Sequence, residues 1–297
     1  MNERMIKALR RAGSIAAEAR DLGREMIGEG VGYLEVADEV EDRIRDRGGQ
    51  PAFPVNISVN EVAAHYSPSS NDGKRFSSGD VVKLDVGAHV DGFIGDTAVT
   101  VEVGTRNHDR LIESADRALI MALEMIGEGV QVGTLGGAIE RSIKGDGFEP
   151  VVNLTGHSME RYCLHAGITV PNIDDGNLAR VKDGMVVAVE PFATEGAGQV
   201  TNSKPGNIYR VLRERPLKDK RAQEFFSQLR ERFDGLPFCE RWCTDLEKKP
   251  NPLLRNLVRH GLISSYPILK EIKGGVVSQS EHTVVIRGKK AEILTIT

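Results

Sequence analysis

Four carboxylates of this chain lie in or next to strand-like sequence. Asp85 closes an apolar run that starts at residue 79, and Asp96 follows eleven residues later. The glycine-rich stretch between them indicates a hairpin that would turn Asp96 back beside Asp85. Glu190 ends the run Met-Val-Val-Ala-Val, and Glu281 stands in the β-rich run 276–286. Taken singly, each acid could equally be a turn residue or face solvent.

A histidine completes a possible set of metal ligands. His157 follows a glycine and the apolar run Val-Val-Asn-Leu. One imidazole with four carboxylates suits two divalent first-row metal ions better than a single tetrahedral zinc ion. Two dications would also balance four convergent carboxylates, which would otherwise repel each other and take up protons. Such a metal pair activates water and polarises a carbonyl, so the predicted chemistry is hydrolysis.

Two more histidines could face a substrate. His65 and His165 both stand beside small residues that would let a substrate approach, although a lone histidine is more often a structural hydrogen-bonding residue. A structural role is the prediction for the remaining histidines: His89, His108, His260 and His282.

The elements that must position these residues occur twice. Residues 25–31 and 124–130 both read Glu-Met-Ile-Gly-Glu-Gly-Val, and helix-period apolar positions precede and follow each copy. The strand-like runs that end at Asp85 and Glu190 also correspond, with a carboxylate six residues after a glycine. We therefore predict an ancient duplication whose halves pack about a pseudo-twofold axis, with a site between them.

One stretch interrupts the duplication. Residues 208–265 are rich in charge, show helical spacing of apolar residues and contain four prolines. We predict a helical insertion here, after which the chain returns to strands that rejoin the main sheet.

Bulk composition narrows the possible functions. With 39 Lys and Arg against 43 Asp and Glu, the net charge of −4 gives no global case for a nucleic-acid or membrane partner. The three cysteines, without a secretory segment, favour a reducing compartment, and no apolar run approaches the ~18 residues of a membrane span. These features predict a cytoplasmic protein.

The motifs together resemble the methionine aminopeptidases, whose pita-bread fold is shared with aminopeptidase P and prolidase. The resemblance covers nearly the whole chain and rests on five motifs in family order: Ala63-Ala-His65-Tyr, Lys83-Leu-Asp85-Val-Gly with Asp96, Gly156-His157 with His165-Ala-Gly, Glu190-Pro-Phe-Ala, and Ser280-Glu281-His-Thr. It implies an α+β fold of two pseudo-twofold-related halves around a curved antiparallel sheet. Residues 1–207 plus 266–297 would form the catalytic domain and 208–265 the insertion, which resembles the type 2 class in its short archaeal form.

The resemblance also implies roles for the residues. Asp85 would chelate one metal ion, Asp96 and Glu281 would bridge the two ions, and His157 and Glu190 would bind the other. Glu190 would also shuttle a proton. His65 and His165 would contact substrate and stabilise the tetrahedral intermediate, and a methionine pocket would be lined by Phe53, Leu164 and Tyr266.

The implied activity is removal of the initiator methionine from nascent peptides whose second residue is small. The two ions could be cobalt, manganese, iron or zinc, since this ligand set accepts all four. The resemblance further implies a monomer that associates transiently with the ribosome, with no nucleic-acid or membrane partner. Two alternatives stay open: a prolidase or aminopeptidase P, and a non-catalytic pita-bread module that binds peptides, histones or RNA.

Overall fold

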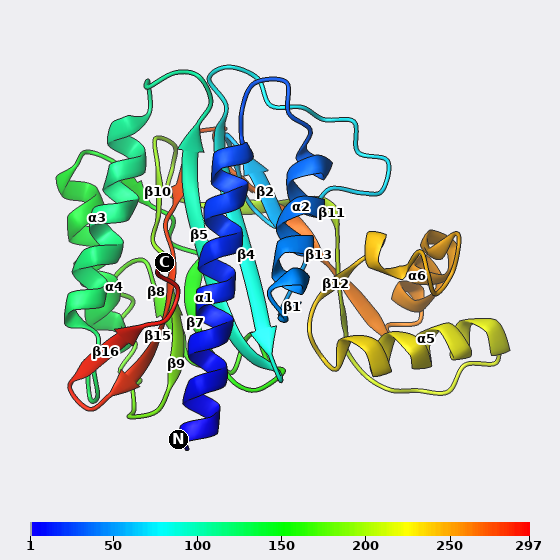
Figure 1. The fold of residues 1–297 in the computed structure, drawn as a ribbon. Helices are drawn as coiled ribbons and strands as arrows, with labels where there is room; N and C mark the ends of the chain where they lie inside the picture. The colour runs from blue at the N-terminus through cyan, green and yellow to red at the C-terminus, as the bar shows by residue number, and fades with distance from the viewer. Residues whose placement is uncertain (1) are drawn as a thin grey trace.

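The computed structural model, which describes residues 2–297, begins with a long helix laid against a β-hairpin (Figure 1). The helix is α1 (Glu3–Met26), and the hairpin consists of β4 (Val81–Val90) and β5 (Phe93–Glu102). Small residues allow this close packing, because a Cβ added at Gly95 of the hairpin would lie 2.6 Å from the Cα of Gly13 in the helix. The N-terminal helix is thus fixed directly behind the strands that carry Asp85 and Asp96.

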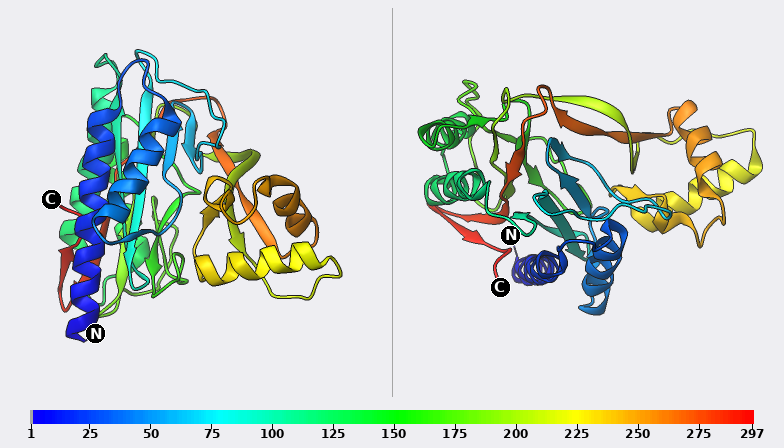
Figure 2. Two further views of the ribbon diagram at one scale, coloured as in Figure 1. Left: turned by 45° about the vertical axis from the view of Figure 1, so that its right-hand side comes forward. Right: turned by 90° about the horizontal axis from the view of Figure 1, so that it is seen from above.

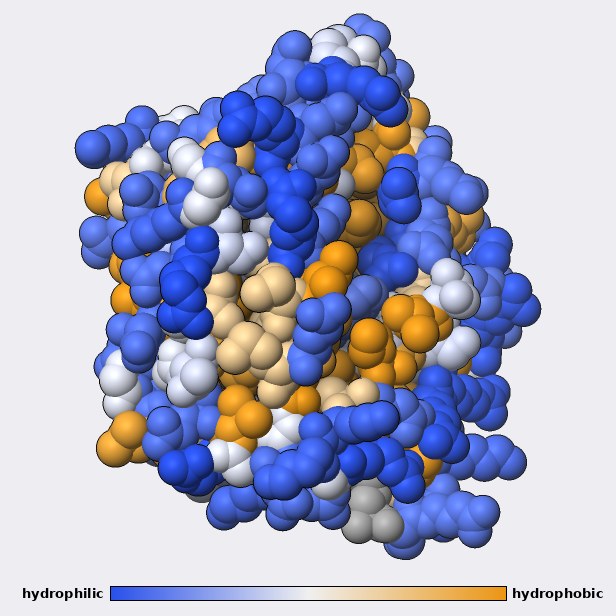
Figure 3. Space-filling view, turned by 90° about the vertical axis from the view of Figure 1, so that its left-hand side faces the viewer, coloured by the Kyte–Doolittle hydropathy of each residue, from blue (hydrophilic) through white to orange (hydrophobic). Residues whose placement is uncertain are grey.

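Both repeat copies are links between two helices, as predicted. The first joins α1 to α2 (Tyr33–Asp46), and the second joins α3 (Asp109–Met125) to α4 (Val132–Gly145). Each helix pair buries its apolar face against the strands of its own half. Seen from above, these four helices lie outside the strands (Figure 2). The face on the side of α3 and α4 is largely hydrophilic, with an apolar patch in its middle (Figure 3).

The strands form antiparallel sheets that differ in size. The first sheet has the order β1 (Gln50–Pro51), β4, β2 (Asn56–Val59), and β5 also pairs with β4. The second sheet has the order β16-β15-β9-β7-β8. A third has the order β14-β10-β6, and the fourth β12-β11-β13-β3. The bounds of these further strands are β3 (Val62–Ala64), β6 (Glu149–Pro150), β7 (Thr155–Met159), β8 (Thr169–Pro171), β9 (Val186–Val189), β10 (Phe192–Thr194), β11 (Val200–Val211), β12 (Phe238–Cys239), β13 (Ile263–Glu271), β14 (Val277–Gln279), β15 (His282–Arg287) and β16 (Lys290–Ile293).

The segment around 208–265 projects to one side of the strands (Figures 1 and 2). It contains α5 (Lys220–Phe233), a short 3-10 helix (Arg241–Cys243) and α6 (Pro250–Arg259). These elements enclose a hydrophobic cluster of their own around Phe226, Phe238 and Leu257. The strands β11 and β13 pair along their length and connect this cluster to the rest of the chain.

Two details of the predicted strands differ from the structure. Asp85 lies in the middle of β4 rather than at its end, because the strand continues as far as the turn at Asp91 and Gly92. The run 276–286 is two strands rather than one, since it breaks at Ser280 and Glu281.

Within residues 2–297, no helix combines the length and the apolarity needed to cross a membrane.

Candidate active site

The β4–β5 hairpin brings the first two carboxylates together. In its register Asp85 is opposite Ala98 and Gly87 is opposite Asp96. Residues two apart on a strand share a face, as do directly opposed residues on paired strands. Asp85 and Asp96 therefore point from the same face of the hairpin, and Asp96 is only 3% exposed.

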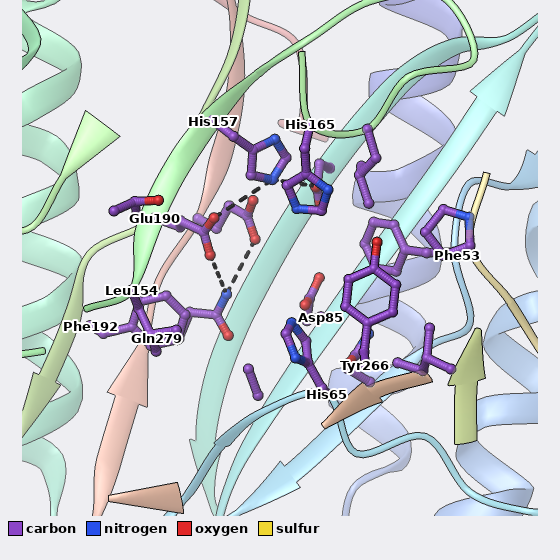
Figure 4. A pocket seen from close by; sticks show the side chains of 18 of the residues that line it. Phe53, His65, Asp85, Leu154, His157, His165, Glu190, Phe192, Tyr266 and Gln279 are labelled. Carbon is purple, nitrogen blue, oxygen red and sulfur yellow. Dashed lines mark hydrogen bonds and ion pairs between the residues drawn. The ribbon is translucent and has the colours of Figure 1, made fainter. Parts of the chain in front are cut away.

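The second half contributes His157 and Glu190 from neighbouring strands. His157 of β7 pairs with Ala188 of β9, and Glu190 follows directly after β9. The Nε2 atom of His157 lies 3.7 Å from Oδ2 of Asp96 and 3.7 Å from Oε1 of Glu190 (Figure 4). This imidazole therefore stands between carboxylates of the two halves.

Glu281 joins the group through a backbone bridge. It lies between β14 and β15 and exchanges hydrogen bonds with Ala98: its N–H donates at 3.1 Å and its carbonyl accepts at 3.4 Å. The Thr97 hydroxyl donates to the same carbonyl at 2.8 Å, and the Thr283 hydroxyl donates to the Asp96 carbonyl at 2.7 Å. These bonds fix the backbone of Glu281 beside that of Asp96.

The four carboxylates are not balanced by basic side chains. Across residues 2–297, their ion pairs are with His157 only. Burial raises the pKa of Asp85 to about 7. Burial and then the neighbouring acids raise the pKa values of Asp96, Glu190 and Glu281 well above the usual range. Burial, and then His165, lowers the pKa of His157 to about 3. An uncompensated acidic cluster with a neutral imidazole is the electrostatic setting that bound cations would relieve.

The donor set fits divalent metal ions. Ligand atoms of Asp96, His157 and Glu281 all lie within 4.8 Å of one another. Oδ1 of Asp85 and Oδ1 of Asp96 are buried without a hydrogen-bond partner, which is costly for a carboxylate unless a cation binds it. Carboxylate oxygens with one imidazole nitrogen are ordinary ligands for such ions.

His65 is held in a single orientation. Its backbone has φ 67°, which is uncommon for a residue with a side chain, and its Nδ1 lies 3.1 Å from the carbonyl of Pro267. Because a carbonyl only accepts, Nδ1 carries the hydrogen and Nε2 is left with its lone pair. Burial lowers the pKa of His65, so the ring stays neutral.

His165 lies on the other side of the same space. Its ring centroid is 4.4 Å from that of His157 and 6.4 Å from that of Tyr266. Desolvation, and then the positive charges that His65 and Arg210 can carry, lowers the pKa of His165 to about 4. At neutral pH this imidazole is also neutral.

All of these side chains line one cavity of about 220 Å³ (Figure 4). The structure brings together every site residue predicted from the sequence, including the three pocket residues Phe53, Leu164 and Tyr266. It also places there residues that the sequence analysis missed: Asn56, Ala64, Asn153, Leu154, Thr155, Phe192, Ile208, Pro237 and Gln279. Of these, Gln279 contacts the cluster directly, since its Nε2 donates to Glu190 at 3.3 Å and to Glu281 at 3.4 Å.

A signal in the sequence could have found some of the missed residues. Phe192 is two residues after Glu190, Gln279 is two before Glu281, and Thr155 is two before His157. Thr155 and His157 are in one strand, where side chains two apart share a face, and the strand-like sequence around Glu190 and Glu281 made the residues at the same offset candidates for the cavity wall.

The four histidines predicted to be structural lie outside the cavity. Three bond locally: His89 Nδ1 accepts from the N–H of Gly92, His260 contacts the carbonyl of Asn256, and His282 contacts the hydroxyl of Thr295. His108 lies 3.3 Å from the carboxylate of Glu102.

Comparison with known proteins agrees with this geometry. Residues 7–287 match the sequence pattern of metallopeptidase family M24. This chain belongs to family M24. It is 43% identical to a methionine aminopeptidase of Methanothermobacter thermautotrophicus over 98% of this chain and 99% of that one. It is also 44% identical to a methionine aminopeptidase of Archaeoglobus fulgidus over 99% of this chain and 100% of that one.

Solved structures of family members and their relatives share the fold. A methionine aminopeptidase of Thermotoga maritima matches with a TM-score of 0.74 at 24% identity, and covers 100% of this chain and 98% of its own. A thermophilic Arx1 matches with a TM-score of 0.88 at 14% identity over 100% and 92%. A prolidase of Pyrococcus furiosus matches at 0.64 and 20% identity, but only 65% of that chain is covered. The predicted pita-bread fold and the predicted family are therefore confirmed.

Proposed function

We propose that this chain is a metal-dependent methionine aminopeptidase that removes the N-terminal methionine of nascent peptides when the second residue is small. The observation that carries this proposal is the buried cluster of four carboxylates and one imidazole, without basic partners, at the wall of a cavity. Methionine aminopeptidases that match this chain over nearly its full length also support the proposal.

The proposed cofactor is a pair of divalent ions, drawn from cobalt, manganese, iron or zinc. Asp85 would chelate one ion, His157 and Glu190 would bind the other, and Asp96 and Glu281 would bridge them. When bound, such a pair lowers the pKa of water and polarises the scissile carbonyl. The ligand positions follow the family resemblance, and the mutual proximity of Asp96, His157 and Glu281 supports them.

The two substrate-facing histidines differ in what their rings can do. His65 presents the unprotonated Nε2, so it can accept a hydrogen bond from an N–H of the substrate but cannot donate one to an oxyanion. His165 has a neutral ring without such a fixed tautomer, and it can donate to the oxygen of the tetrahedral transition state. We therefore assign amide recognition to His65 and oxyanion stabilisation to His165.

Glu190 is placed to move the proton. Its carboxyl group lies 3.7 Å from His157 at the cavity wall, where it can take a proton from the attacking water, and the Gln279 amide at 3.3 Å orients it. Release of that proton to the leaving amine would return Glu190 to its starting state.

The methionine side chain would lie against the apolar part of the cavity wall. Phe53, Leu164 and Tyr266 are the proposed pocket residues, and Phe192 and Ile208 extend the same wall. A cavity of about 220 Å³ accommodates one unbranched apolar side chain next to the ligand cluster.

Reconstitution tests the proposal. Metal-free protein should be inactive, regain activity with a divalent ion, and cleave Met-Ala or Met-Gly peptides but not Met-Lys or Met-Phe peptides. Cleavage before proline irrespective of the first residue would favour an aminopeptidase P. Metal binding without cleavage of any peptide would favour a non-catalytic binding module.

The domain bounds, the cellular location and the oligomeric state are part of the same proposal. Residues 1–207 with 266–297 would form the catalytic domain and 208–265 the insertion, a division supported by the separate hydrophobic cluster around Phe226. We place the enzyme in the cytoplasm as a monomer that meets its nascent substrates by transient contact with the ribosome. The insertion carries 13 basic against 8 acidic residues in a chain of net charge −4, which supports contact with an anionic partner surface.

A further inference from the structure

A carboxylate that is not part of the acidic cluster lies buried on the inner face of α2. Glu41 is 1% exposed and shares this face with Val40 and Ile44. A buried charge is costly unless it is paired and hydrogen-bonded. The groups that pair with the Glu41 carboxylate therefore indicate its structural role.

Those partners come from the insertion, about two hundred residues along the chain. Arg241 forms a two-pronged contact with Glu41, with Nη2 donating to Oε1 at 2.7 Å and Nη1 donating to Oε2 at 3.0 Å. The indole N–H of Trp242 donates to Oε2 at 2.6 Å. The Arg241 side chain is only 7% exposed, so solvent screens this ion pair weakly.

Besides Arg45 of the same helix, whose Nη2 lies 3.7 Å from Oε2 of Glu41, a further partner comes from the cavity wall. The backbone N–H of Val55 donates to Oε1 at 3.2 Å, and this residue lies between Phe53 and Asn56, which both line the cavity. Arg241 reaches a second wall segment as well, because its Nε donates at 3.0 Å to the carbonyl of Pro68, three residues after His65. One arginine of the insertion thus connects two segments that carry substrate-facing side chains.

We infer that Arg241 and Trp242 are positioning residues that set the substrate pocket through Glu41 and the N–H of Val55. The insertion then acts on specificity without supplying a ligand to the acidic cluster. This inference rests on the proposed function for its kinetic consequence, whereas its structural consequence is independent of activity.

The sharpest variant is Trp242→Phe, which keeps an aromatic ring against Phe233 and removes the N–H donor together with part of the indole ring. Glu41→Gln weakens the whole contact. Arg221→Gln is the matched control, because Arg221 pairs with Glu247 inside the insertion and touches neither wall segment. All three variants are compared with the parent protein by thermal unfolding, so that only folded protein is used.

Two measurements decide the inference. In hydrogen exchange followed by mass spectrometry, the peptide containing Val55 should exchange about tenfold faster in Trp242→Phe and in Glu41→Gln than in the parent or in Arg221→Gln. In kinetics on Met-Ala peptides, KM should rise on the order of tenfold, with kcat and metal content within about twofold of the parent.

A purely structural contact would lower the unfolding temperature and leave KM unchanged. Unchanged exchange at Val55 together with unchanged KM in folded Trp242→Phe overturns the inference. If the parent cleaves no methionyl peptide, the proposed function fails, and the exchange data alone then decide whether the insertion holds the wall. Should Glu41→Gln fail to fold, Trp242→Phe carries both measurements.

Discussion

Metal-free protein should lose stability as the pH rises above about 6.5. Burial raises the pKa of Asp85 from 3.8 to about 7, and the pKa values of Asp96, Glu190 and Glu281 are raised as well. The folded protein then keeps protons that the unfolded chain has released. Stability falls with increasing pH wherever the folded state binds the larger number of protons.

The pH range of this loss of stability depends on the histidines as well as on the acids. Burial lowers the pKa of His157 to about 3 and that of His165 to about 4, so these rings destabilise the fold only where the unfolded chain has protonated histidines. Above about pH 6.5 that contribution is over, because the unfolded histidines are also neutral. Above about pH 7 the buried amine of Lys83, whose pKa burial lowers to about 7, acts in the opposite sense, because the unfolded lysine keeps its proton. The carboxyl groups with raised pKa values, those of Asp96, Glu190 and Glu281, outnumber it.

The size of the effect follows from the number of protons retained. Each excess proton in the folded state lowers the free energy of unfolding by about 1.4 kcal/mol per pH unit. One carboxyl proton retained beyond the one that Lys83 offsets therefore gives a net loss of about 1.4 kcal/mol per pH unit. Compared with a total stability of roughly 5–15 kcal/mol, the change is large.

Urea unfolding at several pH values, with a chelator and with saturating divalent ion, measures this dependence. The metal-loaded protein should show a much smaller slope, because bound cations keep the carboxylates ionised. Metal-free Asp96→Asn should show a slope smaller than the parent by about one proton. Because Lys83 contributes equally to both proteins, equal slopes from about pH 6.5 to 8.5 in the metal-free parent and in metal-free Asp96→Asn would refute the interpretation of this cluster.

Two further outcomes follow from the site. His157→Ala should weaken metal binding and lose activity, part of which returns at high metal concentration. His165→Ala should keep its metal and lose about 10²–10³-fold in kcat. Calorimetric metal titration and steady-state kinetics distinguish the two variants, and loss of metal in His165→Ala alone would contradict the assignment. Replacing Asp234, Asp245 and Glu247 together by alanine should leave the metal stoichiometry unchanged. These acids lie outside the acidic cluster, and two of them pair with arginines of the insertion. Loss of a metal ion in this variant would show that the insertion supplies a ligand.

The approach of Asp85 to Asp96 could be predicted because it depends on local geometry. Asp85 and Asp96 are in one hairpin, and the strand period with a tight turn fixes their relation. The repeat copies at 25–31 and 124–130 likewise identified two helix pairs, since each pair forms from contiguous amphipathic sequence. Features of this kind need only a few neighbouring residues.

Features that depend on distant partners could not be predicted. The tautomer of His65 is set by the carbonyl of Pro267, which lies 202 residues away. Glu41 occupies a place in α2 that is consistent with an apolar or a solvated face, and only its bonds with Arg241, 200 residues later, show that it is buried and paired. Neither contact leaves a periodic signal in the sequence.

The position of Glu281 explains how a long insertion can coexist with a precise site. Asp85 and Asp96 come from the first half, and His157 and Glu190 come from the second, all before the insertion. Glu281 follows it and reaches the cluster through its backbone bridge to Ala98, a separation of 183 residues. The paired strands β11 and β13 return the chain close to where it left, so the length between them does not affect this bridge. Because Glu281 joins the cluster only when this contact forms, the proposed binding of metal by all five residues would require the completed fold.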